Sequence, residues 1–187
     1  TSAHYTQSGA RVVRLQNVGD GVFIDERAYI SLEHYEKLRK YEVREGDLVV
    51  ASLGENPPRA CLVPNLGVPA IVKADCIRVR LHNEVDSRWV LYALSAPAIK
   101  DYAADKLRGV GRPRLGLTQI RNIPIPLPPL AEQRRLVSAL EGLLARIDAG
   151  IRLLRTSERQ AATLLKRVII DAVPIPSPSH WRMATVR

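Results

Sequence analysis

The stretch "IPLPPLAEQRRLVSALEGLL", residues 125–144, decides how the chain is divided. Pro129 suits the first turn of a helix, where its missing N–H leaves no hydrogen bond unmade. Glu132 suits the same turn because it lies near the positive end of the helix dipole. The leucine-rich sequence beyond these residues predicts a long helix that begins at the proline cluster and stops at Pro174.

The predicted helix carries a regular apolar seam. Steps of three and four residues continue over about five heptads, with Glu158 as the polar exception, which is typical of a coiled coil. The expected coiled-coil interface is formed by Val137, Leu140, Leu144, Ile147, Ile151, Leu154, Ala161, Leu165 and Val168. At ~1.5 Å per residue the rod would be roughly 65 Å long. Packing of the helix on its own domain is the alternative, but a seam of this length needs an equally long partner helix. We therefore expect the partner to be another chain or another part of a longer polypeptide.

Short apolar runs separated by turn residues precede the helix. Residues 10–18 and 48–53 predict strands, and residues 69–81 predict one or two more. Helices are expected to begin at Ser31 and Ser87. The predicted fold class is α+β, a small mixed domain followed by a long C-terminal coiled-coil helix. The expected division is a domain over residues 1–127, a helix over 128–173 and a proline-rich tail over 174–187.

The composition suits a globular protein with an anionic partner. The 187 residues are 46% hydrophobic and 25% charged, and the formal net charge is +9. Such a charge favours nucleic acid without proving it. Two cysteines, Cys61 and Cys76, are too few for a disulfide framework and indicate a reducing, cytoplasmic compartment or buried thiols. No apolar run reaches the ~18 residues of a membrane span, so no membrane partner is expected.

A basic, glycine-rich segment before the helix is the best candidate for DNA contact. Glycine lets the backbone approach a surface closely, and arginine binds phosphate or a guanine edge through two hydrogen bonds. A solvated surface loop is the alternative. The candidate DNA-binding residues are Lys106, Arg108, Arg112 and Arg114 in this segment, Arg11, Arg14, Gln16 and Asn17 near the first strand, and Arg59.

Residues 56–59, "NPPR", resemble the catalytic motif of DNA amino-methyltransferases, which hold a flipped base between an asparagine, a carbonyl and an aromatic ring. Arg59 stands where the aromatic residue is needed, and no glycine-rich cofactor loop follows a strand. We therefore expect a turn. The four histidines show no metal-ligand spacing, and no acid–base pair, phosphate loop or nucleophile elbow is recognisable. We predict neither a metal site nor a catalytic residue.

Residues 125–133, "IPLPPLAEQ", resemble the junction in specificity (S) subunits of type I restriction–modification enzymes, where a target-recognition domain precedes a long helix. The segments "VRLQNVGDG", "REGDLVVAS" and "RGVGRPRLGLTQIRNI" resemble further parts of that family, so nearly the whole chain is covered. The resemblance implies a non-catalytic subunit that reads one half of a bipartite target in double-stranded DNA. It also implies three kinds of partner: a methyltransferase (M) subunit that carries S-adenosylmethionine, a restriction/translocase (R) subunit, and a second helix paired antiparallel.

A complete S subunit of this family has two recognition domains and two helices, whereas this chain has one of each. We expect either half of a subunit or a half-subunit that forms a homodimer through the helix. The tail, "PSPSHWRMATVR", resembles the start of a next repeat. Two alternatives remain: a fragment of a DNA amino-methyltransferase, with "NPPR" as a degenerate motif, and a coiled-coil adaptor that does not bind DNA.

Overall fold

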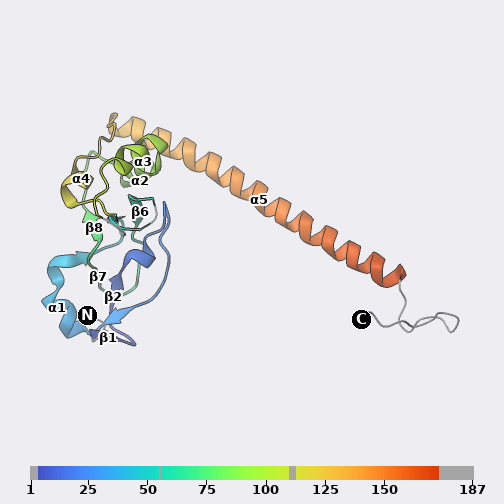
Figure 1. Cartoon of the computed structure of the whole chain (residues 1–187), viewed down its shortest axis with the longest axis horizontal. Coiled ribbons are helices and arrows are strands. Elements are labelled where there is room, and N and C mark those ends of the chain that lie inside the picture. Colours follow the sequence, from blue (N-terminus) through green and yellow to red (C-terminus); the bar gives the residue numbers. More distant parts are fainter. Residues whose placement is uncertain (1–3, 55, 110–112, 173–187) are drawn as a thin grey trace. The chain divides into compact units, whose positions relative to one another are not determined.

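The structure is a computed structural model that describes residues 4–54, 56–109 and 113–172, without the side chains of residues 170–172. The chain divides into two compact units, Thr1–Val137 and Ser138–Arg187. Arg112 and the proline-rich tail, two subjects of prediction, lie outside the described residues. Figure 1 traces the elements in chain order.

Two small sheets form the centre of the first unit. A five-stranded sheet has the order β1-β3-β2-β7-β4, and its strands are Tyr5–Thr6, Tyr29–Ile30, Ala10–Val13, Ala70–Val72 and Glu42–Val43. β2 and β7 run parallel, and the other neighbours are antiparallel. An antiparallel three-stranded sheet has the order β6-β5-β8, with strands Arg59–Leu62, Leu48–Ala51 and Cys76–Val79.

β5 is buried on both faces, which explains its uninterrupted apolar sequence. Successive side chains of a strand point to opposite faces. Val49 and Ala51 join a core that includes Val72 of the five-stranded sheet. Leu48 and Val50 join a second core, which also contains side chains of the helices that cover the three-stranded sheet. A strand covered on both sides has no polar alternation to reveal it.

Short helices cover the outer faces of the two sheets. α1 (Leu32–Lys37) packs Tyr35 on the five-stranded sheet, and Ser31 caps it by accepting the His34 N–H, which confirms the predicted start. α2 (Ser87–Ser95) and α3 (Pro97–Ala104) pack on the three-stranded sheet. The cap of α2 is Asp86, and the pKa of its carboxyl is lowered because the Arg88 guanidinium hydrogen-bonds it. The predicted α+β class is confirmed.

One local prediction differs from the structure. The strand expected over residues 10–18 ends at Val13, and Leu15–Asn17 form the 3-10 turn η2, because the Asn17 side chain binds the backbone there. The basic, glycine-rich segment before α5 is followed by a short helix, α4 (Leu117–Arg121). A further 3-10 turn, η3 (Arg39–Tyr41), precedes β4.

The long helix α5 (Leu130–Ala172) begins directly after Pro129, as predicted. Its first turns belong to the first unit, which therefore extends beyond residue 127. Val137 is only 1% exposed within that unit, so its assignment to the coiled-coil seam is corrected: its side chain is not available to a second helix.

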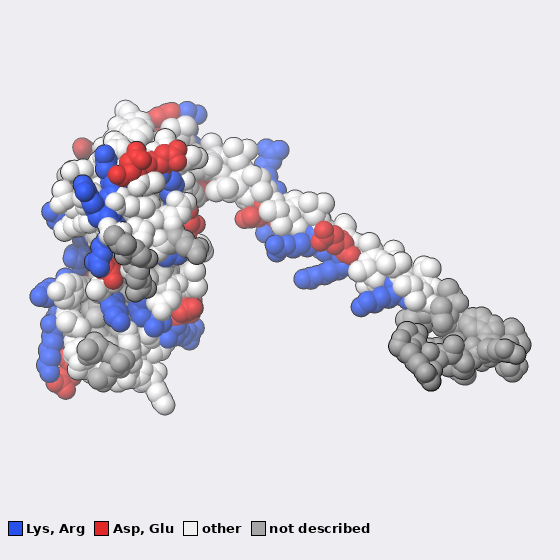
Figure 2. Space-filling view, viewed as in Figure 1, with Lys and Arg blue, Asp and Glu red and all other residues white. Residues whose placement is uncertain are grey.

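Beyond Val137 the seam lies open. Leu144, Ile147 and Leu154 are among its exposed residues. Figure 2 shows white side chains along one edge of α5 and charged ones along the other. No helix in the described part of the chain is both long and apolar enough to cross a membrane.

Candidate nucleic-acid interface

Two basic segments meet beyond the carboxyl end of β5. Arg59 pairs with Ala51 in the ladder between β5 and β6, and Arg114 forms an isolated bridge with Leu53, two residues further along the chain. The Leu115 N–H donates to the carbonyl oxygen of Ser52 at 2.9 Å. These bonds place Arg59 and Arg114, which are far apart in the sequence, at the same end of the three-stranded sheet.

Arg108 and Arg114 face each other on a small hairpin. Their backbones exchange two hydrogen bonds, of 3.0 and 2.8 Å. Gly109 has φ +107°, which side-chain-bearing residues rarely adopt, so a glycine is required at this turn. Residues directly opposite in an antiparallel pair project from the same face, and both arginines are exposed. Lys106, also exposed, has its ammonium 5.4 Å from the centre of the Tyr102 ring.

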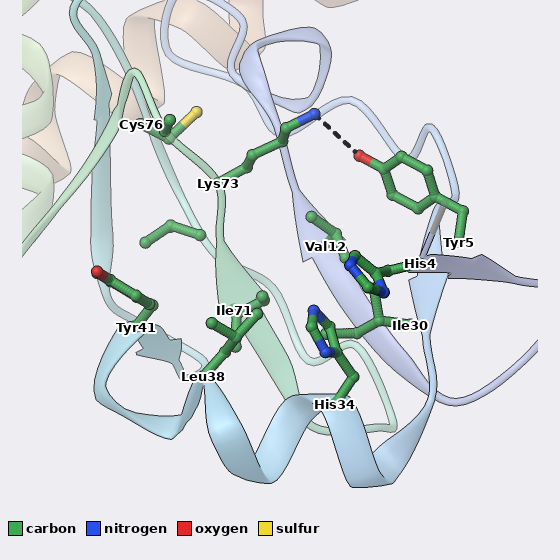
Figure 3. A pocket seen from close by; sticks show the side chains of 12 residues that line it. His4, Tyr5, Val12, Ile30, His34, Leu38, Tyr41, Ile71, Lys73 and Cys76 are labelled. Carbon is green, nitrogen blue, oxygen red and sulfur yellow. Dashed lines mark hydrogen bonds between the residues drawn. The ribbon is translucent and has the colours of Figure 1, made fainter. Parts of the chain in front are cut away.

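A second basic pair follows the parallel strands β2 and β7. Arg14 comes directly after β2 and Lys73 directly after β7, and the Lys73 N–H donates to the carbonyl oxygen of Val13. Both head groups lie over the Tyr5 ring, at 5.9 and 5.5 Å from its centre. Figure 3 shows the Lys73 ammonium donating to the Tyr5 hydroxyl, at 3.3 Å. The sequence analysis did not include Lys73 among the candidate DNA-binding residues. The one feature that could have identified it is its position directly after the apolar run of β7.

Asp75 connects the two basic regions. Its carbonyl oxygen accepts hydrogen bonds from the N–H and the hydroxyl of Ser52. Its carboxylate lies 3.5 Å from the Arg114 guanidinium. We name these five cations the basic cluster: Arg14, Arg59, Lys73, Arg108 and Arg114. The two carboxylates seen to pair with them, Asp75 and Glu26 (3.9 Å from Arg14), leave the cluster with excess positive charge.

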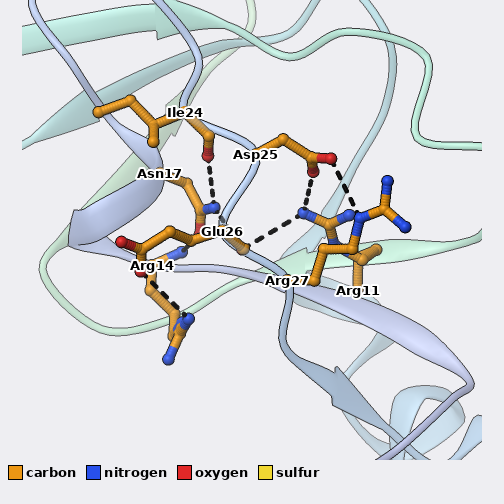
Figure 4. Close-up of polar contacts among 7 residues, drawn as sticks. All are labelled: Arg11, Arg14, Asn17, Ile24, Asp25, Glu26 and Arg27. Carbon is orange, nitrogen blue, oxygen red and sulfur yellow. Dashed lines mark hydrogen bonds and ion pairs between the residues drawn. The ribbon is translucent and has the colours of Figure 1, made fainter. Parts of the chain in front are cut away.

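Arg11 and Asn17 do not belong to this surface, and their assignment to DNA contact is corrected. Arg11 is 4% exposed, and its guanidinium pairs with Asp25 at 2.7 Å, which lowers the pKa of that carboxyl. Asn17 is fully buried; its amide donates to the carbonyl oxygens of Ile24 and Glu26. Figure 4 shows both side chains turned toward the segment from Ile24 to Arg27. Both side chains fix the position of this segment through hydrogen bonds. Gln16, by contrast, is exposed.

The comparisons with known proteins agree on one family. Residues 12–153 match the model of the type I restriction modification DNA specificity domain. The chain belongs to this family. The MjaVIII type I specificity subunit of Methanocaldococcus jannaschii is 23% identical over 175 residues, which are 89% of this chain and 40% of that one. The EcoBI specificity subunit of Escherichia coli is 23% identical over 94% of this chain and 37% of its own length.

Solved structures share the fold of the specificity domain. The HsdS subunit from Thermoanaerobacter tengcongensis has a TM-score of 0.67 and 22% identity over 92% of this chain and 46% of that chain. A second structure, from work on complex assembly of the type I R-M system, has a TM-score of 0.62 and 21% identity over 90% of this chain and 38% of that one. The chain thus spans about two fifths of the length of the two curated relatives described above.

The "NPPR" segment of the specificity domain is a structural turn, as predicted. The Lys100 side chain is 8% exposed, and its ammonium donates to the carbonyl oxygens of Pro58 (2.6 Å) and Asn56 (3.4 Å). The same ammonium pairs with Asp20 at 3.0 Å. The backbone oxygens that would hold a base in a methyltransferase are therefore occupied. The Arg59 guanidinium lies against Gly54, where a Cβ would come within 2.9 Å of it.

A cavity of about 360 Å³ lies beside the basic cluster, on the five-stranded sheet. Val12, Ile30 and Ile71 form its apolar lining, and the rings of His4 and His34 stack 4.3 Å apart at its edge (Figure 3). The described residues contain no group of three or more His, Cys, Asp or Glu that could hold a metal ion.

The two cysteines are expected to be chemically inert in the folded protein. Cys61 and Cys76 lie on either side of β5, and burial raises the pKa of each thiol to about 12. At pH 8 both thiols are therefore protonated, which makes them poor nucleophiles. We expect no reaction with Ellman's reagent in buffer and reaction of both in guanidinium chloride. Rapid labelling of the folded chain would show that the β5 core opens readily.

Proposed function

We propose that this specificity domain reads one half of a bipartite target in double-stranded DNA, as a non-catalytic subunit or half-subunit of a type I restriction–modification complex. The observation that carries the proposal is the basic cluster, in which four separate parts of the chain present cations at neighbouring strand ends. Excess positive charge on an exposed, preformed surface suits a phosphate backbone.

The members of the cluster suit different parts of the DNA. Lys73 and Arg14 follow rigid, paired strands, so their charges are held at fixed positions from which phosphates can be bound. Arg108 and Arg114 face each other across a backbone bridge, and both side chains are exposed. A guanidinium makes two parallel hydrogen bonds to a guanine edge and so distinguishes one base from another. A contact to phosphate provides no such discrimination. We assign base reading to Arg108 and Arg114, and support to Gln16, Arg59 and Lys106. Arg112, which lies outside the described residues, stays a candidate for base reading on its sequence position alone.

Replacing Arg108 and Arg114 with alanine tests this assignment. Each lost phosphate or base contact should weaken DNA binding and flatten the dependence of log Kd on log salt by about 0.9 per charge. The free energy of unfolding should change by less than ~0.5 kcal/mol, because both side chains are exposed. Fluorescence anisotropy with a labelled duplex and thermal melting measure the two quantities.

The matched control replaces Lys37, an exposed cation of α1 that pairs with Glu33, with alanine. That variant should bind DNA as the unsubstituted chain does. Unchanged affinity and salt slope in the two arginine variants would place the DNA-binding surface elsewhere on the domain.

We further propose the partners of the complex. The M subunit, which would carry S-adenosylmethionine, and the R subunit would assemble with this chain in the cytoplasm. The exposed seam of α5 would pair with a second such helix, in a homodimer or within a longer polypeptide. Its apolar stripe supports this, because monomeric proteins rarely leave so long a contiguous stripe in water. DNA binding without S-adenosylmethionine binding by the chain alone would exclude both the methyltransferase and the adaptor alternatives.

A further inference from the structure

A basic stripe runs along the later part of α5. At 3.6 residues per turn its members lie within roughly 60° of one another around the helix axis. We define the basic stripe as Arg152, Arg155, Arg159 and Lys166, all of which are exposed. Its centre lies roughly 100° from that of the apolar seam. Figure 2 shows blue side chains, with some red ones among them, along one edge of α5 and white side chains along the other. A helix paired through the seam therefore keeps this stripe at its flank.

The four head groups of the stripe have no ion-pair partner among the residues whose side chains the structure describes: no carboxylate there lies within ion-pair distance of them. Elsewhere on the same helix the structure does show such a pair, between Arg135 and Glu132 at 2.7 Å. The four long side chains thus extend into solvent with their charges available to a partner.

A second copy of the helix leaves the excess charge in place. Residues 138–169 contain six Lys or Arg and only three carboxylates, Glu141, Asp148 and Glu158. A paired copy brings the same excess of three positive charges. Pairing through the seam therefore accounts for the apolar residues and leaves a net positive charge on the helix pair. A strongly anionic partner would balance that charge.

We propose that the basic stripe binds the phosphate backbone of double-stranded DNA, outside the bases that the globular unit reads. The inference rests on the proposed function, which brings the chain onto DNA. From Arg152 to Lys166 the helix rises about 21 Å, a length over which a duplex presents about twelve phosphates. A straight row of cations meets a regular row of phosphates whatever the base sequence. The stripe adds affinity and no sequence preference.

A charge-removing variant of the full chain measures this contribution. We expect Arg152→Gln, Arg155→Gln, Arg159→Gln and Lys166→Gln, combined, to flatten the salt dependence of binding to a mixed-sequence duplex by about 3 to 4. The matched control carries lysine at the three arginine positions and should keep the slope, since the charges remain. Circular dichroism should show equal helix content in all three proteins.

Photo-crosslinking locates the contact independently. A cysteine at Thr163, between Arg159 and Lys166, carries an azidophenacyl group, and a cysteine at Ser157, on the opposite side of the helix, serves as control. Cys61 and Cys76 are expected not to take the label, because both are buried, and labelling of the unsubstituted chain checks this. We expect Thr163→Cys to crosslink to duplex DNA and Ser157→Cys not to do so.

The outcomes separate this inference from the proposed function. An unchanged salt slope together with no crosslink at position 163 overturns the inference, and the function stands if Arg108→Ala and Arg114→Ala still weaken binding. If those two variants also bind normally, the proposed function fails as well. If the glutamine variant binds DNA normally but no longer captures the M subunit, an acidic protein surface occupies the stripe and the DNA assignment is wrong.

Discussion

Replacing Gln133 with alanine is expected to lower the free energy of unfolding of the globular unit by about 3 kcal/mol. The side chain is fully buried where α5 leaves the domain. Its amide donates to the carbonyl oxygens of Glu84 (3.2 Å) and Pro128 (2.7 Å), and its oxygen accepts the N–H of Asp86 at 2.9 Å. Alanine would leave all three backbone groups without these partners.

Thermal melting measures the effect, which corresponds to a fall of about 6–12 °C in Tm for a chain of this size. Gln160→Ala, at an exposed position of the same helix, is the matched control and should melt like the unsubstituted chain. Gln133→Glu should also be destabilising, because a carboxylate cannot donate to the two carbonyls. If Gln133→Ala melts unchanged, the helix is attached to the domain by other contacts.

Replacing both Leu144 and Ile147 with aspartate is expected to abolish pairing through α5. Each aspartate would place a charge in the apolar seam, where burial of an unpaired carboxylate costs several kcal/mol. The dissociation constant of a homodimer should rise at least ~100-fold, since each 1.4 kcal/mol changes it about tenfold. Sedimentation velocity measures the change in mass directly.

The matched control is Ala145→Asp with Ala149→Asp, which adds the same charge to the same turns but away from the seam. This variant should associate as the unsubstituted chain does. A strictly monomeric unsubstituted chain at concentrations of about 50 μM would contradict self-pairing. The partner helix would then have to come from a longer polypeptide or from another subunit.

Local signals predicted much of the fold. Pro129 and the heptad spacing located the start of α5, and Ser31 located that of α1, because both are set by residues within one turn of the helix end. The apolar run of β5 was recognised as a strand. The fold class follows from the order of such elements, and the comparison structures confirm it.

Contacts between residues far apart in the sequence could not be predicted. Arg11 and Asn17 look like surface residues because they are polar, and only Asp25 and the loop beside it, brought near by folding, make them internal. The buried Lys100 ammonium is hydrogen-bonded to a carboxylate and two carbonyl oxygens that lie far away in the sequence. Gln133 lay inside a recognised motif but had no assigned role, because two of its three partners, Glu84 and Asp86, belong to the distant segment just before α2. Val137 fits the heptad spacing yet packs in the domain.

The most direct test of the central claim is selection from a random-sequence duplex library by the full chain. Bound DNA is recovered over several rounds at moderate salt and sequenced, with the Arg108→Ala, Arg114→Ala double variant selected in parallel. The account predicts that one short motif is enriched by the unsubstituted chain and is lost or relaxed in the variant. Salt-dependent binding that enriches no motif would contradict it, since the domain would then hold DNA without reading its sequence.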